Sequence, residues 1–281
     1  MVVLLGLAAA VLYGGGDFLG GMATRRAHVL TVLTLVETAA VILAVAVAWL
    51  TGGPATLPGL IWGFSAGAIG GLGLIIFYVG LAAGPMSVVA PVAGLVSTVL
   101  PVAVALAEGE RPGPAVYAGA LLCLVAIVLA SAAPEASDTK SRPHRLARAL
   151  AYGTASGVAF GLFFLLIRNA GQSGEVWPVA AGRIGELAIV LAATAVLRPG
   201  LRGVSGGIPL AAVSAGVIDV VANLCYVAAT RTGSFGLAVV LASLYPGVTV
   251  LLARVVLGER LRTIQRLGLG LAAIGILLVT V

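Results

Sequence analysis

The chain is a succession of charge-poor apolar segments separated by short links that carry glycine, proline or charge. A run of about 18 to 25 such residues is long enough to cross the hydrocarbon core of a bilayer as a helix. Ten-residue segments that alternate between polar and apolar positions, typical of a membrane barrel, do not occur. The pattern predicts ten helices, at 2–21, 29–51, 59–81, 85–107, 114–132, 149–168, 176–197, 208–230, 234–257 and 263–281.

Composition indicates an all-α integral membrane protein. Of 281 residues, 60% are hydrophobic and 9% are charged, which is too little charge to cover a soluble domain. The net charge of +6 comes from basic residues in the links rather than from an aromatic-rich patch, so no nucleic-acid partner is expected. The sequence is apolar from its first residues and has no basic leader segment, so residues 1–20 are expected to be a retained span.

The second half of the chain repeats the first at a constant offset. Residues 84–129 return as 233–278, which is 149 positions later. Matching positions include Glu37 and Glu186, Ser65 and Ser214, Gly84 and Gly233, and the Gly-Glu-Arg triplets at 109–111 and 258–260. We therefore predict a duplicated chain. Residues 1–132 form the first five-helix unit, 133–148 a polar linker and 149–281 the second unit, packed together as one bundle.

An odd number of helices in each unit means that the second unit enters the membrane from the opposite side. Inverted repeats of this kind are found in many secondary transporters, whose binding site lies near the midplane between the repeats. Basic residues are concentrated in the links on one face, for example at Arg25 and Arg26. Positive-inside reasoning makes this face cytoplasmic and places both termini outside. The expected location is the cell (inner) membrane.

Several charged residues fall inside the predicted spans. A charge at the bilayer centre costs about 2.5 to 3.5 kcal/mol on insertion scales, so it requires a partner or a function. Glu37, Glu186 and Asp219 are predicted near mid-depth. Arg183 lies three residues before Glu186 and therefore on nearly the same helical face, and Asn223 lies one turn beyond Asp219. These five residues are candidates for binding a solute or a proton.

Asp17 and three tyrosines complete the candidates. Asp17 follows Gly14-Gly15-Gly16, which weakens the helix, so an irregular or closely packed turn is expected there. Because Asp17 is predicted nearer a helix end, snorkelling or an interfacial salt bridge is an alternative role. Tyr78, Tyr226 and Tyr245 lie within spans and could line a pathway.

The charged residues predict a polar cavity between the two units. Acids outnumber the single mid-span arginine, so a cationic or zwitterionic solute, or a proton, fits better than a multiply charged anion. The alternative is that Arg183 and Glu186 only neutralise each other inside the bundle. This alternative applies less well to Glu37 and Asp219, which have no cation within one turn on their own helices.

Glycine and proline patterns predict how the helices pack. In the third predicted helix, glycines at three- and four-residue spacing would let a neighbouring backbone approach closely; they are Gly63, Gly67, Gly70, Gly71 and Gly73. Prolines that remove backbone hydrogen bonds predict kinks in the fourth and ninth helices; they are Pro85, Pro91, Pro101 and Pro246. The Gly-Glu-Arg triplets are expected to set helix ends.

No enzyme motif is present. His28 and His144 fall in links, without partners at metal-ligand spacing. The sequence lacks a phosphate-binding loop and a GxSxG serine. Cys123 and Cys225 lie in apolar runs, where packing is the expected role. We therefore expect no enzymatic activity, no metal and no cofactor.

The segment 257–261 (Leu-Gly-Glu-Arg-Leu) before a last helix with Gly268 and Gly275, and the opening 12–18 followed by Arg25-Arg26, resemble the EamA-type transporters of the drug/metabolite transporter superfamily. This resemblance implies a secondary carrier that works by alternating access and is driven by protons or by the solute gradient. Members export amino acids, metabolites, purines or drugs, so the solute is not implied. Many members carry an arginine in the second helix, where this chain has Thr34.

The expected function is therefore export of a small metabolite, such as an amino acid or another cationic or zwitterionic solute. Glu37, Glu186 and Asp219 would bind the solute or exchange protons, and Arg183 would orient a carboxylate or fix Glu186. Two alternatives remain: a lipid or drug flippase with a laterally open groove, and a non-transporting membrane scaffold or sensor. Expected partners are membrane lipid, the solute and a proton.

Overall fold

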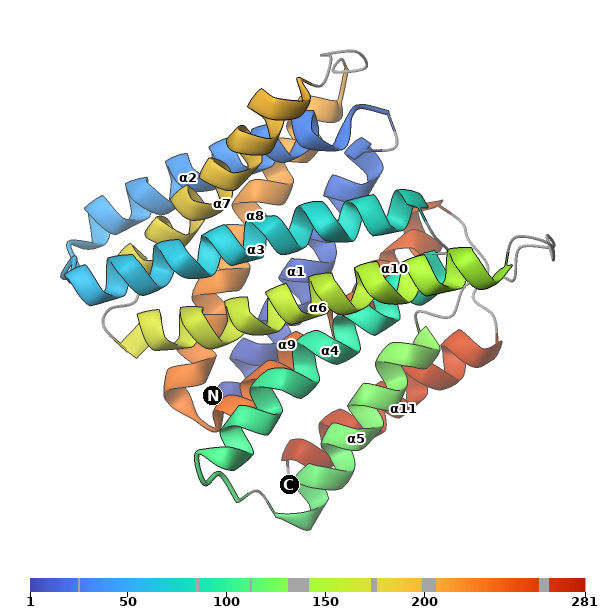
Figure 1. Cartoon of the computed structure of the whole chain (residues 1–281). Helices are drawn as coiled ribbons and strands as arrows, with labels where there is room; N and C mark the ends of the chain where they lie inside the picture. The colour runs from blue at the N-terminus through green and yellow to red at the C-terminus, as the bar shows by residue number, and fades with distance from the viewer. Residues whose placement is uncertain are drawn as a thin grey trace.

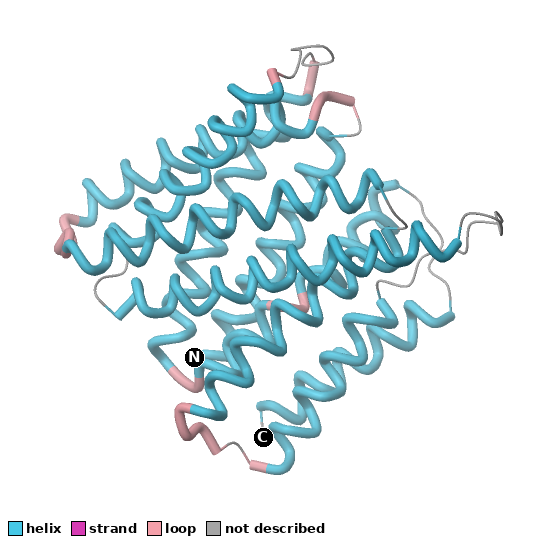
Figure 2. Tube along the Cα trace, in the orientation of Figure 1, coloured by secondary structure: helices cyan, strands magenta, loops and turns pink. Residues whose placement is uncertain are grey.

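The computed structural model describes residues 1–24, 26–83, 86–111, 113–130, 142–172, 176–198, 206–257 and 263–280. These residues form eleven α-helices and no strand (Figures 1 and 2). The helices are α1 Val2–Thr24, α2 Val29–Thr51, α3 Leu57–Ala83, α4 Met86–Ala107, α5 Pro114–Ala130, α6 Arg142–Gln172, α7 Val176–Leu197, α8 Ile208–Thr232, α9 Phe235–Ala242, α10 Tyr245–Leu257 and α11 Thr263–Thr280.

Each predicted helix has a counterpart in the structure, with two differences. The sixth predicted helix, 149–168, is longer in the structure, because α6 already begins at Arg142. The last part of the predicted linker is therefore helical. The second Gly-Glu-Arg triplet, at 258–260, and residues 131–141 of the linker region lie outside the described residues.

The ninth predicted helix, 234–257, is divided into α9 and α10. Pro246 has no N–H to donate to the carbonyl four residues earlier, so the helical hydrogen-bond ladder is interrupted at this point. Before Pro246 the chain makes a turn, in which Ser243 N donates to Val239 O at 2.9 Å and Leu244 N donates to Leu241 O at 3.2 Å. The expected kink is therefore a break between two shorter helices.

Of the irregular or closely packed turn expected at Gly14–Gly16, the structure shows the close packing within a continuous α1. Gly14 lies against the Tyr245 carbonyl and the Val248 side chain, where an added Cβ would clash. A Cβ at Gly16 would make only an ordinary van der Waals contact with the Ala215 carbonyl. The missing side chain at Gly14 therefore lets α1 approach α10 closely.

The two halves of the chain are interleaved. α3 packs on α6 and α7, while α8 packs on α1 and α2. α4 packs on α6, and α1 packs on α9 and α10. α5 and α11 pair with each other at one edge of the bundle (Figure 1). Helices from the first half therefore find most of their neighbours in the second half.

Glycines of α3 and α7 make the closest helix crossing. A Cβ at Gly67 would overlap the Gly182 carbonyl, and one at Gly63 would overlap the carbonyl of Pro178. From the other side, a Cβ at Gly185 would overlap the Phe64 carbonyl. The glycine spacing in α3 thus serves backbone contact, as predicted, and it places the polar face of α7 against the middle of α3.

The outside of the bundle is apolar. Large hydrophobic side chains are exposed on many helices, among them Leu4, Ile42, Leu121, Leu191, Leu210 and Val255. Six helices are long and apolar enough to cross a membrane, namely α1, α2, α3, α6, α7 and α8. Shorter apolar helices lie in α4, α5, α9–α10 and α11. Exposure of this much apolar surface is expected of a multi-pass membrane protein.

Candidate functional site

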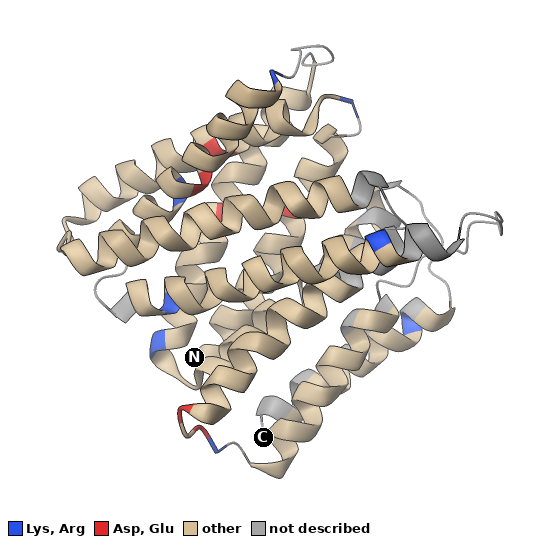
Figure 3. Ribbon diagram, in the orientation of Figure 1, with Lys and Arg blue, Asp and Glu red and all other residues tan. Residues whose placement is uncertain are grey.

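A cavity of about 130 Å³ lies between helices of both halves. Charged positions interrupt the otherwise uncharged helices in the middle of the bundle as well as at its ends (Figure 3). Eight of the nine predicted site residues line the cavity: Asp17, Glu37, Tyr78, Arg183, Glu186, Asp219, Asn223 and Tyr245. The ninth, Tyr226, does not. The fold therefore gathers side chains from α1, α2, α3, α7, α8 and α10 around one space.

Arg183 is the centre of an ion cluster that joins three helices. Its Nη1 lies 2.6 Å from Glu186 Oε2 on the same helix, donates to Asp219 Oδ2 on α8, and lies 3.5 Å from Glu37 Oε2 on α2. The contact with Glu186 is an ion pair without hydrogen-bond geometry, since Oε2 accepts no hydrogen bond. The isolated Arg183–Glu186 pair considered from the sequence is thus part of a cluster of four residues.

This cluster is buried. Glu37 is 2% exposed, Arg183 3% and Glu186 7%, whereas the Asp219 side chain is 26% exposed. Among the described residues, four carboxylates but one guanidinium line the cavity, so their full ionisation would leave three negative charges in excess. An uncompensated charge of this kind is unfavourable in an apolar environment. The site therefore needs protons or a positively charged ligand to balance it.

Gly70 makes room for Glu186. A Cβ at Gly70 would lie 2.9 Å from Glu186 Oε1 and 3.0 Å from Phe163 Cδ2. The position that corresponds to Gly70 in the second half, 149 residues later, is Asp219. At this pair of repeat-related positions, the first half has Gly70, which faces the Glu186 carboxylate, and the second half has the carboxylate of Asp219. This difference between the halves makes the charge distribution of the cavity asymmetric.

Asp17 lies on the cavity wall rather than at a helix end. It makes no ion pair with any described residue, so the interfacial salt bridge considered from the sequence is not formed within the described part of the chain. Asn223 is 1% exposed and donates from Nδ2 to the Asp219 carbonyl at 2.9 Å. Its Oδ1 is buried and accepts no hydrogen bond. Asp17 and Asn223 are therefore free to contact a ligand.

Aromatic rings form much of the remaining wall. Sequence reasoning singled out Tyr78 and Tyr245, which line the cavity, but missed a larger group: Tyr13, Phe77, Phe160, Phe163 and Phe164. The similarity of 13–14 to 160–161 in the two halves was the available signal. Tyr226 is instead fully buried behind the wall, where its hydroxyl donates to the Phe164 carbonyl at 3.4 Å. Its role is to support Phe164.

The chain is similar to known proteins in the sequence of its second half and in its overall fold. Residues 147–281 match the model of the EamA-like transporter family. A solved structure described as "Crystal structure of protein" has the same fold, with a TM-score of 0.76 and 21% identity, over 99% of this chain and 96% of that one. The second half of the chain is therefore an EamA-like transporter domain. A search of the curated proteins found no match to the chain. The EamA family is a transporter family rather than an enzyme family.

Thr34 is the first-half position that corresponds to Arg183, 149 residues earlier. Its hydroxyl donates to the Leu30 carbonyl at 2.7 Å and lies 3.4 Å from Thr194 Oγ1. Thr34 does not line the cavity. Arg183 therefore has no counterpart from the first repeat, and the lining contains one guanidinium.

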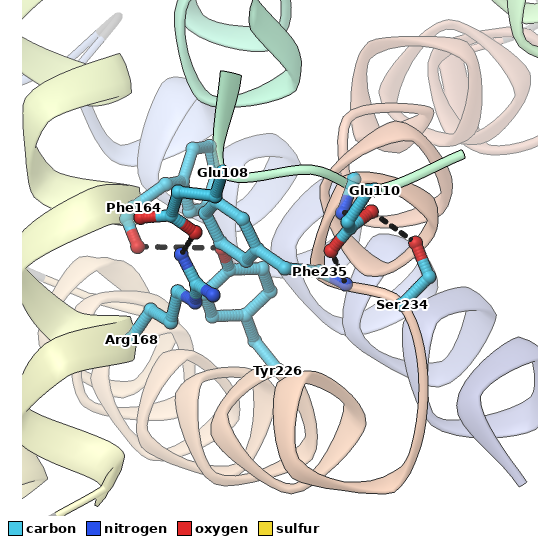
Figure 4. Close-up of polar contacts among 8 residues, drawn as sticks. Glu108, Glu110, Phe164, Arg168, Tyr226, Ser234 and Phe235 are labelled. Carbon is cyan, nitrogen blue, oxygen red and sulfur yellow. Dashed lines mark hydrogen bonds and ion pairs between the residues drawn. The ribbon is translucent and has the colours of Figure 1, made fainter. Parts of the chain in front are cut away.

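A second polar cluster, drawn in Figure 4, is formed by residues that do not line the cavity: Glu108, Glu110, Arg168, Ser234 and Phe235. Arg168 at the end of α6 donates to Glu108 Oε2 at 2.6 Å, and its guanidinium stacks 4.2 Å from the centre of the Phe235 ring. Glu110 accepts from Ser234 Oγ at 2.6 Å and from Phe235 N at 2.9 Å. The first Gly-Glu-Arg triplet thus caps α9 of the other half, which agrees with its expected structural role.

Proposed function

We propose that this protein is a secondary transporter in which ten membrane-crossing segments form two inverted five-helix units. α9 and α10 together would serve as one segment, with its break beside the cavity. The two units, residues 1–132 and 149–281, would rock about the cavity and expose it to each side of the cell membrane in turn. Discontinuous helices beside a central site are a recurrent feature of such carriers.

The pairing of helices supports inversion. If α1–α5 correspond to α6, α7, α8, α9–α10 and α11, exchanging the halves turns each major packing pair into another. The α3–α6 pair becomes α8–α1, and α3–α7 becomes α8–α2. In the same way α4–α6 becomes the packing of α9 and α10 on α1, and α5–α11 is unchanged. A pseudo-two-fold axis in the membrane plane would produce this arrangement.

The single observation that carries the proposal is the excess of acids in the cavity. Arg183 compensates one of four carboxylates, so binding of a cationic or zwitterionic solute, or of protons, is electrostatically favoured over binding of an anion. The same acids could couple export of the solute to entry of protons. An exchange of this kind requires that solute and proton compete for the same carboxylates, and Glu37, Glu186 and Asp219 are close enough to do so.

The size of the cavity favours a small solute. At about 130 Å³, it is similar to the roughly 150 Å³ engineered cavity that holds benzene. A phospholipid would not fit, which argues against a flippase in this conformation. A scaffold or sensor would have no need for a cavity lined by four acids, one arginine and buried polar atoms without partners.

Counterflow in proteoliposomes tests the proposal. Purified protein would be loaded with unlabelled solute and assayed with a labelled panel of amino acids, nucleosides, polyamines and organic amines. We expect saturable exchange of a solute that carries a positive charge, and loss of at least about ten-fold in rate for Glu37→Gln and Glu186→Gln. Exchange that persists at the wild-type rate in both variants would exclude these acids as binding or coupling groups.

A further inference from the structure

We propose that Asp17, Tyr78 and Tyr245 form an amine-binding subsite of the cavity, selective for an organic ammonium ion with an apolar body. The proposal rests on the proposed function, since it assumes that the cavity takes a solute. It narrows the solute from cationic or zwitterionic to cationic. Four observations support it. Arg183 already contacts three carboxylates, and Asp17 has no ion pair with a described residue. Aromatic rings line the cavity, and two buried atoms of the lining that can accept hydrogen bonds have no partner.

Arg183 cannot readily serve as a carboxylate receptor. Its guanidinium already contacts Glu37, Glu186 and Asp219 through Nη1. The carboxylate of a bound amino acid would bring a further negative charge into a site where acids are already in excess. The unpartnered Arg183 Nε would more readily donate a hydrogen bond to a neutral carbonyl or hydroxyl oxygen. The cavity thus offers no good partner for the acidic end of a zwitterion.

Asp17 lines the cavity together with Tyr78 and Tyr245. Gly14, one turn before Asp17, packs on the backbone of Tyr245, and Gly20, about one turn after it, would place a Cβ 3.7 Å from the Tyr78 hydroxyl. Because positions three residues apart share a helix face, the face of α1 that carries Asp17 lies next to both tyrosines. Within the described part of the chain, Asp17 is therefore a carboxylate without an ion pair that shares the cavity with two aromatic rings.

The rings continue into a wall. Tyr245 meets Tyr13 edge-on with centroids 6.4 Å apart, and Tyr78 meets Phe77 at 5.9 Å. Phe77 in turn contacts Phe160 at 5.9 Å. Aromatic faces attract cations through the ring quadrupole and also bind apolar groups. A carboxylate beside such a wall suits a molecule with an ammonium group at one end and an alkyl or aryl body at the other.

Two unpartnered atoms of the cavity lining can accept hydrogen bonds. Asn223 Oδ1 is buried without a hydrogen bond, and the amide donates from Nδ2 to the Asp219 carbonyl. The Tyr13 hydroxyl is also buried without a partner, and it can either accept or donate. An ammonium group carries donors only. Its N–H groups could therefore satisfy Asp17 together with both of these atoms, whereas a carboxylate could not bond to Asn223 Oδ1.

Binding of three related ligands to the full-length protein tests the subsite. Isothermal titration would compare phenethylamine, phenylalanine and 3-phenylpropionate, which share an aromatic body and differ in charge. We expect phenethylamine to bind at least about ten times more tightly than the other two. Asp17→Asn should weaken phenethylamine binding about 10- to 100-fold, as expected for loss of a charge-assisted hydrogen bond. Glu108→Gln, in the second polar cluster, is the matched control and should bind like the wild type.

Two substitutions of Tyr245 keep the test informative if Asp17→Asn does not fold. Tyr245→Phe should retain amine binding, because the ring remains, and Tyr245→Leu should weaken it several-fold.

Equal amine binding by wild type and Asp17→Asn would overturn the subsite, and so would phenylalanine binding as tightly as phenethylamine. If a zwitterion is exchanged in counterflow while Asp17→Asn has no effect, the subsite is wrong and the transporter proposal stands. If no panel solute is exchanged by the wild type, the proposed function itself fails.

Discussion

The two arginine clusters of this protein differ in stoichiometry and burial. Arg168 meets one carboxylate, Glu108, whose side chain is 49% exposed, and stacks on Phe235. Arg183 meets three carboxylates within the bundle and is 3% exposed. The first cluster lies where helices end and joins α6 to the segment after α4. The second cluster lies inside the bundle, where burying a charge is unfavourable, and its three carboxylates outnumber its one guanidinium.

This difference distinguishes polar residues that stabilise the fold from polar residues that bind a ligand. A balanced pair near a helix end is explained by local packing and contributes little stability. A buried site with more acids than bases is costly for folding, and the fold keeps it next to a cavity, two unpaired acceptors and an aromatic wall. We infer that the central cluster exists for binding, whereas the outer one holds the two halves together.

Removing the central cation should have the largest effect. Arg183→Met would leave Glu37, Glu186 and Asp219 buried without a counter-charge, so we expect a loss of about 3–5 kcal/mol in stability. Thermal unfolding of the purified protein would measure it. Arg183→Lys keeps the charge and should lose less. If Arg183→Met melted at the wild-type temperature, the three acids would not depend on Arg183, and the contrast between the clusters would disappear.

Filling the space beside Glu186 should have the next largest effect. In Gly70→Ala the new methyl would press on Glu186 Oε1 and on the Phe163 ring, and crowding of this kind costs about 1–3 kcal/mol. Gly15→Ala is the matched control, since a Cβ at Gly15 would meet nothing within 4 Å. Alanine there should stabilise α1 by about 0.5–1 kcal/mol. Equal melting temperatures for the two variants would contradict the tight fit at Gly70.

In the outer cluster, loss of the α9 cap should be moderate. Glu110→Ala removes the acceptor of Ser234 Oγ and of the backbone N–H groups of Phe235 and Gly236. Loss of a helix N-cap typically costs about 0.5–2 kcal/mol. Hydrogen exchange at the first turn of α9 should increase while the cavity ligands bind as before. Loss of ligand binding together with the cap would show that the outer cluster also shapes the site.

The smallest effect is expected at the exposed ion pair. Glu108→Gln keeps a hydrogen-bond acceptor for Arg168 and removes one charge, so we expect a change of about 0.2–1 kcal/mol that shrinks at high salt. Melting at low and high ionic strength would measure it. A loss as large as that in Arg183→Met would remove the distinction between the two clusters.

The sequence predicted most of the fold because membrane helices must satisfy their backbone hydrogen bonds internally and so appear as long apolar runs. It also identified Glu37, Arg183, Glu186 and Asp219, because a charge within such a run stands out. The contacts between them could not be predicted, since Arg183 reaches Glu37 and Asp219 across helices far apart in the chain. Tyr226 was predicted to line the pathway and does not line the cavity. Its position within a helix does not show which face of that helix is turned to the cavity.

Helix breaks and aromatic residues were harder to predict. Pro246 signalled a distortion, but the sequence did not distinguish a kink from the break that separates α9 and α10. The glycines of α1 predicted an irregular or closely packed turn without distinguishing the two, and the structure shows close packing at Gly14. Phe77 and Phe163 were missed because an apolar ring in a membrane helix is equally suited to lipid, to packing or to a cavity.

The claim that the central acids serve transport while the outer ones serve structure is tested most directly by counterflow of one exchanged solute through two variants. Asp219→Asn removes the most exposed acid of the central cluster, and Glu108→Gln removes an acid of the outer cluster. Both would be reconstituted at equal density and compared with the wild type. The account predicts that Asp219→Asn loses at least about ten-fold in exchange rate, while Glu108→Gln exchanges at the wild-type rate. Equal rates for the two variants would contradict it.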